Sequence, residues 1–207
     1  MKLDAVVYTV AGMAFGVILG WVVGSQQLGR TATVPAAAPV QQSAAPAAGQ
    51  SGGRTPPALD QARVDQLTAT VNGDPKNTTA IVQLANVYFD AERFTDAISW
   101  YEKALALDPK NADVSTDLGV SYYYTNRTEE ALKRFEESLK IDPKHTKTLL
   151  NKGIVLAFGK EDLKGAAAQW QKVVDLAPGT PEGEAARRAL EGVAAAVHNN
   201  QATPNQQ

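Results

Sequence analysis

The chain has 207 residues and a formal net charge of −2, with 20 Lys and Arg against 22 Asp and Glu, and 44% of its residues are hydrophobic. Non-specific nucleic-acid affinity requires concentrated positive charge, so this balance argues against a nucleic-acid partner. The chain has no Cys and only 2 His. It therefore lacks the residues needed for disulfides, for thiolate nucleophiles and for the usual zinc sites. We therefore expect no metal and no other cofactor.

The N-terminal region, residues 1–24, contains an apolar run, AVVYTVAGMAFGVILGWVVG, over residues 5–24. Twenty helical residues span about 30 Å, the thickness of the hydrocarbon core of a bilayer, so the run predicts a transmembrane anchor. The alternative is a cleavable signal peptide, which would release a secreted, soluble binding module. Signal peptides usually have a shorter apolar region of about 7 to 15 residues, which favours the retained anchor.

A glycine recurs every fourth residue in this run, at Gly12, Gly16, Gly20 and Gly24. On a helix these positions share one face, where a second helix can approach closely enough for backbone contact. The pattern predicts self-association or docking onto a partner helix within the membrane. The alternative is that Gly is simply common in transmembrane helices.

Few charges bear on the orientation of this helix. Lys2 and the α-amine precede it, against Asp4, and the first charge after it is Arg30. The positive-inside bias then places the short N-terminus in the cytoplasm and the rest of the chain outside it. For a bacterial cell this predicts a single-pass protein of the inner (cytoplasmic) membrane with its main domain in the periplasm.

Residues 25–57 read as a disordered linker. This segment of 33 residues contains eight Ala, five Pro, five Gln and four Gly, with no aromatic and no acidic side chain. It cannot bury enough apolar surface to offset the entropy of ordering, and its prolines would interrupt any helix. As a loose coil it would hold the following domain on the order of 30 Å from the membrane.

The strongest pattern is a repeat. Prolines recur at spacings of 34, 34 and 35 residues, at Pro75, Pro109, Pro143 and Pro178. Aligned on these prolines, small residues fall at matching places in two helices of each unit: Ala85, Gly119 and Gly153, and then Ala97, Ala131 and Ala166. Large aromatic side chains lie beside them in the alignment: Tyr88, Tyr101, Tyr122, Phe135 and Trp170. We expect these aromatics to form the core.

Residues 78–178 resemble the tetratricopeptide repeat (TPR) family in this pattern of small and large residues with a closing Pro. The resemblance implies an all-α solenoid of three helix-turn-helix repeats, at about 78–111, 112–145 and 146–179. Helices over 58–71 and 181–198 would cap the ends of the stack, completing a domain of residues 58–198. Residues 199–207 are polar and predicted to be a disordered tail.

The resemblance also implies a concave groove, lined by the first helix of each repeat, that binds a peptide or protein. The groove positions carried over from the family are Val82, Asn86, Phe89 and Asp90, then Asp113, Thr116, Val120, Tyr123 and Tyr124, then Lys147, Leu150, Asn151, Ile154 and Phe158. Chaperone-binding members of the family hold a terminal carboxylate with Lys, Asn and Arg at such positions. Here only Asn86 and Lys147 fit, and Asp117 would repel a carboxylate, so that mode is disfavoured.

No sequence motif of an enzyme is present: there is no nucleophile elbow, no P-loop, no dinucleotide-binding glycine pattern and no zinc-protease motif. We therefore expect a protein without catalytic activity, acting as a membrane-anchored scaffold for protein binding. A narrower alternative is an assembly factor similar to the TPR-containing subunits of cytochrome c maturation.

Overall fold

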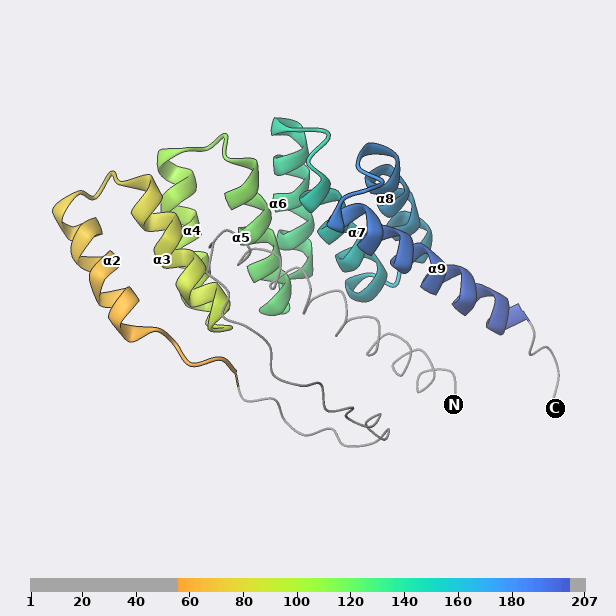
Figure 1. The fold of residues 1–207 in the computed structure, drawn as a ribbon, viewed down its shortest axis with the longest axis horizontal. Helices are drawn as coiled ribbons and strands as arrows, with labels where there is room; N and C mark the ends of the chain where they lie inside the picture. The colour runs from red at the N-terminus through yellow and green to blue at the C-terminus, as the bar shows by residue number, and fades with distance from the viewer. Residues whose placement is uncertain (1–55, 202–207) are drawn as a thin grey trace, which may run out of the picture.

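The computed structural model describes residues 56–201, and within that range the chain forms eight helices and no strand (Figure 1). Their bounds are α2 (Gln61–Gly73), α3 (Thr78–Asp90), α4 (Phe94–Leu107), α5 (Ala112–Tyr124), α6 (Thr128–Ile141), α7 (Thr146–Gly159), α8 (Leu163–Leu176) and α9 (Pro181–Gln201). Successive helices α3 to α8 pack as three antiparallel pairs, one for each predicted repeat, and the pairs stack in a row.

Several of the sequence predictions concern residues outside this described range. The transmembrane helix over 5–24, its glycine face and nearly all of the linker over 25–57 lie outside the described residues, as does the tail beyond Gln201. Within residues 56–201, no helix is both long enough and apolar enough to cross a bilayer.

Three of the four repeating prolines, Pro75, Pro109 and Pro143, lie in the same kind of turn, each just before a helix pair. The sequence Asp-Pro-Lys occurs at 74–76, 108–110 and 142–144. In each case the Asp carboxylate accepts a hydrogen bond from the Lys backbone N–H, at 3.1, 3.3 and 2.9 Å in chain order. Such a turn stops one helix and redirects the chain into the next, because Pro cannot continue the helix and Asp satisfies a local donor.

The turn inside each pair contains one non-glycine residue with left-handed backbone geometry: Glu92 at φ 57°, Asn126 at φ 61° and Glu161 at φ 57°. These residues stand 34 and 35 positions apart, so the third repeat carries its extra residue before this point. Asn tolerates this conformation better than Glu, because its short side chain can hydrogen-bond locally.

Small residues on the first helix leave room for rings on the second. A Cβ added to Gly119 would lie 2.6 Å from a Phe135 ring carbon, and one added to Gly153 would overlap the indole of Trp170. Phe135 and Trp170 are fully buried, as are Ala97, Ala131 and Ala166. The prediction that small residues permit close helix crossing is confirmed. Of the aromatics assigned to the core, only Tyr88 remains partly exposed.

The core is divided in two. One buried cluster runs from α2 to α6 and includes Val155 of α7, and the other runs from α7 to α9. Near this division lies a hydroxyl layer, formed by Thr116 of α5, Ser138 of α6 and Thr148 of α7. Its three hydroxyl oxygens lie 2.5 to 3.1 Å apart. Thr116 and Ser138 also donate to the backbone carbonyl of Ala112, so the layer is internally satisfied.

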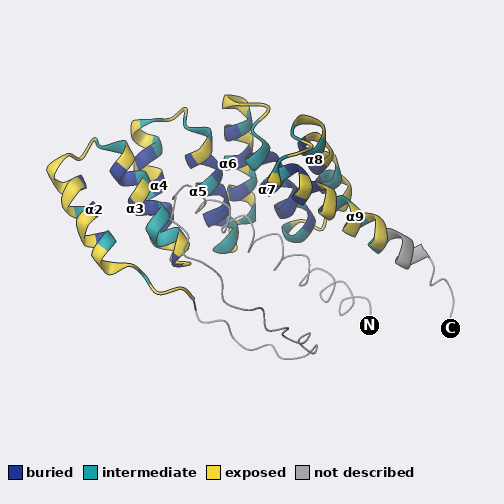
Figure 2. Cartoon of the chain, viewed as in Figure 1, coloured by how far each residue is buried: buried dark blue, intermediate teal, exposed yellow. Residues whose placement is uncertain are grey.

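The flanking helices cover both ends of the stack, and their outer faces are exposed (Figure 2). In α2 the buried stripe is Val64, Leu67 and Val71. Ala62, near the start of the same helix, is exposed and lies outside that stripe. Helix α9 begins at Pro181 as predicted, with the Thr180 hydroxyl accepting from the Gly183 N–H at 3.2 Å. It continues to Gln201, three residues beyond the predicted end.

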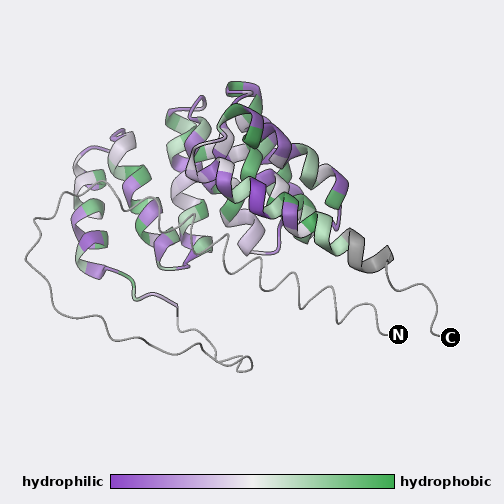
Figure 3. Cartoon of the chain, turned by 45° about the vertical axis from the view of Figure 1, so that its right-hand side comes forward, coloured by the Kyte–Doolittle hydropathy of each residue, from purple (hydrophilic) through white to green (hydrophobic). Residues whose placement is uncertain are grey.

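The hydropathy of the residues also varies along each helix. Figure 3 shows hydrophobic and hydrophilic residues interleaved along every described helix, as amphipathic helices in a stack require. The buried residues of these helices are mainly hydrophobic and pack against neighbouring helices.

Candidate functional site

The first helices of the second and third repeats, α5 and α7, contact each other directly, while α3 precedes them in the row. The face formed by α3, α5 and α7 is the predicted groove. Nine predicted residues are partly or fully exposed there and remain candidates: Val82, Asn86, Phe89, Asp90, Asp113, Tyr123, Tyr124, Lys147 and Phe158.

Five other predicted groove residues are buried and so are not presented to a ligand: Thr116, Val120, Leu150, Asn151 and Ile154. Leu150 and Ile154 are buried because α9 packs against α7, placing them in one cluster with three alanines of α9. Thr116 belongs to the hydroxyl layer, and Val120 belongs to the first core cluster. The Asn151 amide donates to the Lys147 carbonyl at 2.8 Å.

Aromatic rings form a continuous ladder along the ends of α3 and α5. Its contacts are edge-to-face between Phe89 and Phe94 at 5.3 Å, stacked between Phe94 and Tyr124 at 4.3 Å, and tilted between Tyr124 and Tyr123 at 6.1 Å. We call these four residues the aromatic ladder. Phe89 also meets the ring of buried Tyr101 edge-on. Ring contacts of this kind add to the stability of the surface that these side chains form.

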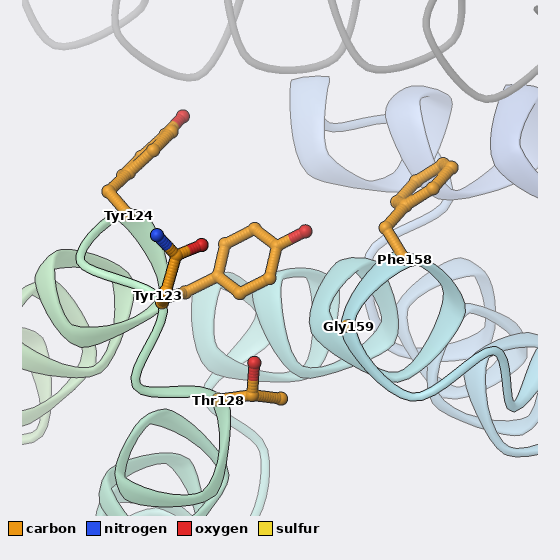
Figure 4. Close-up of a pocket in the computed structure, with 6 residues that line it drawn as sticks. Tyr123, Tyr124, Thr128, Phe158 and Gly159 are labelled. Carbon is orange, nitrogen blue, oxygen red and sulfur yellow. The ribbon is translucent and has the colours of Figure 1, made fainter. Parts of the chain in front are cut away.

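The ladder ends at a pocket between α5 and α7 with a volume of about 390 Å³. Figure 4 shows the Tyr123 ring directed into it, with Phe158 on the far side and Thr128 beneath. The remaining lining residues are Tyr124, Asn126 and Gly159. The volume lies at the small end of the range for ligand pockets, which suits one large side chain rather than a whole segment.

Charged groups occupy the face beside the ladder. Lys147 Nζ of α7 lies 2.7 Å from Asp117 Oδ1 of α5, and both side chains are largely buried. Burial raises the pKa of Asp117, although Lys147 opposes that rise. Asp90, the last residue of α3, also has a raised pKa, first from burial and then from the charge of Asp117.

A third acid, Asp113, lies near the hydroxyl layer. The hydrogen bond to His145 lowers the pKa of Asp113, and the charge of Lys147 adds to this. His145 Nε2 lies 3.3 Å from Asp113 Oδ1, while its Nδ1 lies 2.6 Å from the Thr148 hydroxyl. His145 stands 34 residues after Asn111, which caps α5 through its side chain. In the third repeat His145 occupies this position and does not cap α7 through its side chain. It contacts Asp113 and the Thr148 hydroxyl of the hydroxyl layer instead.

The two residues that match the carboxylate-holding pattern are both engaged. The Tyr101 hydroxyl donates to Asn86 Oδ1 at 2.7 Å, and Lys147 pairs with Asp117. A terminal carboxylate would have to displace Asp117 from Lys147 and would meet an acid in its place. The structure therefore gives a physical reason for the mismatch seen in the sequence.

Four residues of the ladder and pocket were not predicted: Phe94, Asn126, Thr128 and Gly159. They lie in or beside the turns between paired helices, where the helical period no longer assigns a face. Of these four, only Asn126 could have been recognised from the sequence as a turn residue, because Asn favours the left-handed backbone geometry that it adopts here.

Stacked antiparallel helix pairs with a groove along their first helices define an α-helical repeat protein, or solenoid. Two family models, both described as tetratricopeptide repeat, match residues 77–144 and 116–181, which together span half of the chain. The chain belongs to the tetratricopeptide repeat family.

Solved structures share this fold. A crystal structure of MamA is similar at 16% identity and TM-score 0.54, over 68% of this chain and 90% of that one. The Sgt2 TPR domain from Aspergillus fumigatus is 22% identical at TM-score 0.56, over 63% and 86%. The first TPR domain of Spaghetti, bound to the HSP90 peptide SRMEEVD, is 22% identical at TM-score 0.53, over 60% and 96%. No curated protein matches the sequence.

Proposed function

We propose that this protein is a membrane-anchored scaffold that binds a peptide or a peptide-like segment of a partner protein along its concave face. The observation that carries the proposal is the aromatic ladder ending in the pocket of about 390 Å³ between α5 and α7. Grooves lined by aromatic rings and one side-chain-sized pocket suit extended or helical peptides. The similar TPR domain of Spaghetti, which has a peptide bound, supports this use of the fold.

The anchor is the second part of the proposal. Residues 5–24 would form the transmembrane helix, with the N-terminus in the cytoplasm and the TPR domain in the periplasm, and the linker would give the domain its reach. The glycine face would serve association within the membrane. The support for this part is the sequence alone: its length, its lack of charge and its flanking Lys2.

A photocrosslinking amino acid tests the groove in the full chain. We expect benzoylphenylalanine in place of Phe158, which lines the pocket, to give a discrete covalent adduct with a partner in intact membranes. The matched control is the same replacement at Trp100, an aromatic position on α4 whose ring lies under Lys103. Adducts of equal yield from both positions, or from neither, would contradict binding along the concave face.

The anchor is tested on the mature protein. We expect N-terminal sequencing of the membrane fraction to find residues 1–24 retained, and a periplasm-dependent reporter fused after Gln207 to be active. Cleavage near Ser25 would establish the secreted module instead. A reporter active only in the cytoplasm would show that the orientation is reversed.

A further inference from the structure

We propose that the groove selects a cationic peptide, which places an apolar side chain in the α5–α7 pocket and a Lys or Arg side chain against Asp90. This inference rests on the proposed peptide-binding function and names the chemistry of the ligand. Three observations carry it: the shape of the pocket, the charge of the face beside it and the engagement of the groove's lysine.

The pocket is built for a side chain without charge. Tyr123, Tyr124 and Phe158 contribute three rings, and among the lining residues none is charged. An aromatic group that enters can make edge-to-face contacts with these rings, an aliphatic group can pack against them, and either loses little hydration in doing so. The Thr128 hydroxyl and the Asn126 amide give the lining a few polar groups that can hydrogen-bond a peptide backbone.

The pocket exists because residue 159 is a glycine. A Cβ at Gly159 would lie 2.9 Å from Thr128 Cγ2 and 3.1 Å from a Tyr123 ring carbon. Any side chain there would occupy the space between α5 and α7. The pocket can therefore be filled from the protein side without removing a ring, which makes Gly159 the position for a test.

The face beside the ladder carries more negative than positive charge. Asp117 is paired with Lys147, and Asp113 faces His145. Among the described residues Asp90 has no ion-pair partner, and it follows Phe89 of the aromatic ladder directly in the chain. A ligand cation at Asp90 would therefore complete the charge balance of the face, next to the rings that lead to the pocket.

An acidic ligand would meet the opposite conditions. Lys147 is the groove lysine among the predicted positions, and its ammonium group is held by Asp117 at 2.7 Å. Binding a carboxylate would break this pair and bring a third negative charge near Asp90 and Asp117. Like-charge approach in a partly buried site costs affinity, so the groove discriminates against acidic peptides.

The test uses the full chain in lipid nanodiscs and three fluorescein-labelled synthetic peptides of equal length. The first contains lysines and one Phe, the second has Glu in place of every Lys, and the third keeps the lysines but has Ser in place of Phe. Fluorescence anisotropy measures binding. We expect the first peptide to bind at least about tenfold more tightly than either of the others at low salt.

Two variants locate the contacts. Asp90→Asn is expected to weaken the first peptide about fivefold, while Asp175→Asn, which removes an equal charge on α8, leaves it unchanged. Gly159→Val is expected to weaken it at least about tenfold by filling the pocket. Gly192→Val on α9 is its control, because a Cβ at Gly192 meets nothing within 4 Å.

Equal binding of the three peptides, preference for the acidic one, or no binding at all would overturn the inference. Insensitivity to both Asp90→Asn and Gly159→Val would overturn it as well. None of these results bears on the adduct from position 158, which reports partner capture whatever the charge of the ligand. Loss of that adduct is the separate failure of the proposed function.

Discussion

Replacing Trp170 with Ala is expected to lower the free energy of unfolding by about 3–5 kcal/mol, the usual cost of removing a large buried aromatic. Trp170 of α8 is 2% exposed and packs over Gly153 of α7, which leaves room for the indole. Its Nε1–H donates to the Leu150 carbonyl at 3.1 Å. The variant would leave a cavity between α7 and α8, and a carbonyl that has lost its indole donor.

The measurement is urea denaturation of the full chain in detergent, followed by circular dichroism at a helical wavelength. Trp100→Ala is the control, because Trp100 is only partly buried on α4 and its ring lies against Lys103 rather than a glycine. We expect that variant to lose less than half as much. Equal losses would show that the Gly153–Trp170 contact is not a principal stabiliser of the third repeat.

Replacing Lys147 with Met is expected to cost about 3 kcal/mol at neutral pH, because it leaves the carboxylate of Asp117 largely buried without its counter-charge. Met keeps the apolar stem of Lys, so the loss reports the charge rather than the packing. The double variant with Asp117→Asn is expected to recover to within about 1 kcal/mol of the unmodified protein.

The pH dependence gives this prediction a second measurement. Without Lys147, the effect of burial on Asp117 is no longer opposed by its paired cation, and the folded pKa of Asp117 lies further above the unfolded value of about 3.9. Between those two pKa values the folded state binds more protons than the unfolded state, so stability falls as pH rises. The loss relative to the unmodified protein should therefore be small near pH 4 and largest at pH 7. A loss independent of pH would contradict the pairing.

The sequence located the paired helices because the repeat constrains local chemistry. Helix starts follow from capping residues such as Asn77 and Asn111, and helix ends follow from the Asp-Pro-Lys turns. The small and large core positions follow from the spacing, since helices that cross closely need Ala or Gly at the crossing. The same spacing was insufficient to predict which groove residues are exposed. It places residues on a face of one helix, whereas exposure depends on which other helices cover that face.

Leu150 and Ile154 illustrate the difference. Their positions on α7 match the groove, but α9 lies against α7 and buries both. The pocket also could not be predicted from the sequence, because it is formed by the ends of α5 and α7 together with the start of α6. The positions of turn residues relative to neighbouring helices are set by packing angles, which no local pattern encodes.

By itself, the sequence determined the TPR family, the three repeats, their core and the apolar segment that predicts the anchor. All of these are recorded in periodicity, in turn residues and in the lengths of apolar runs, which are local properties. Only the tertiary structure decided which groove residues remain exposed, that Lys147 is held by Asp117, and that a pocket lies between α5 and α7. The physical reason is that burial, pairing and cavity shape arise from contacts between residues about 30 positions or more apart in the chain, and those contacts exist only once the helices have packed.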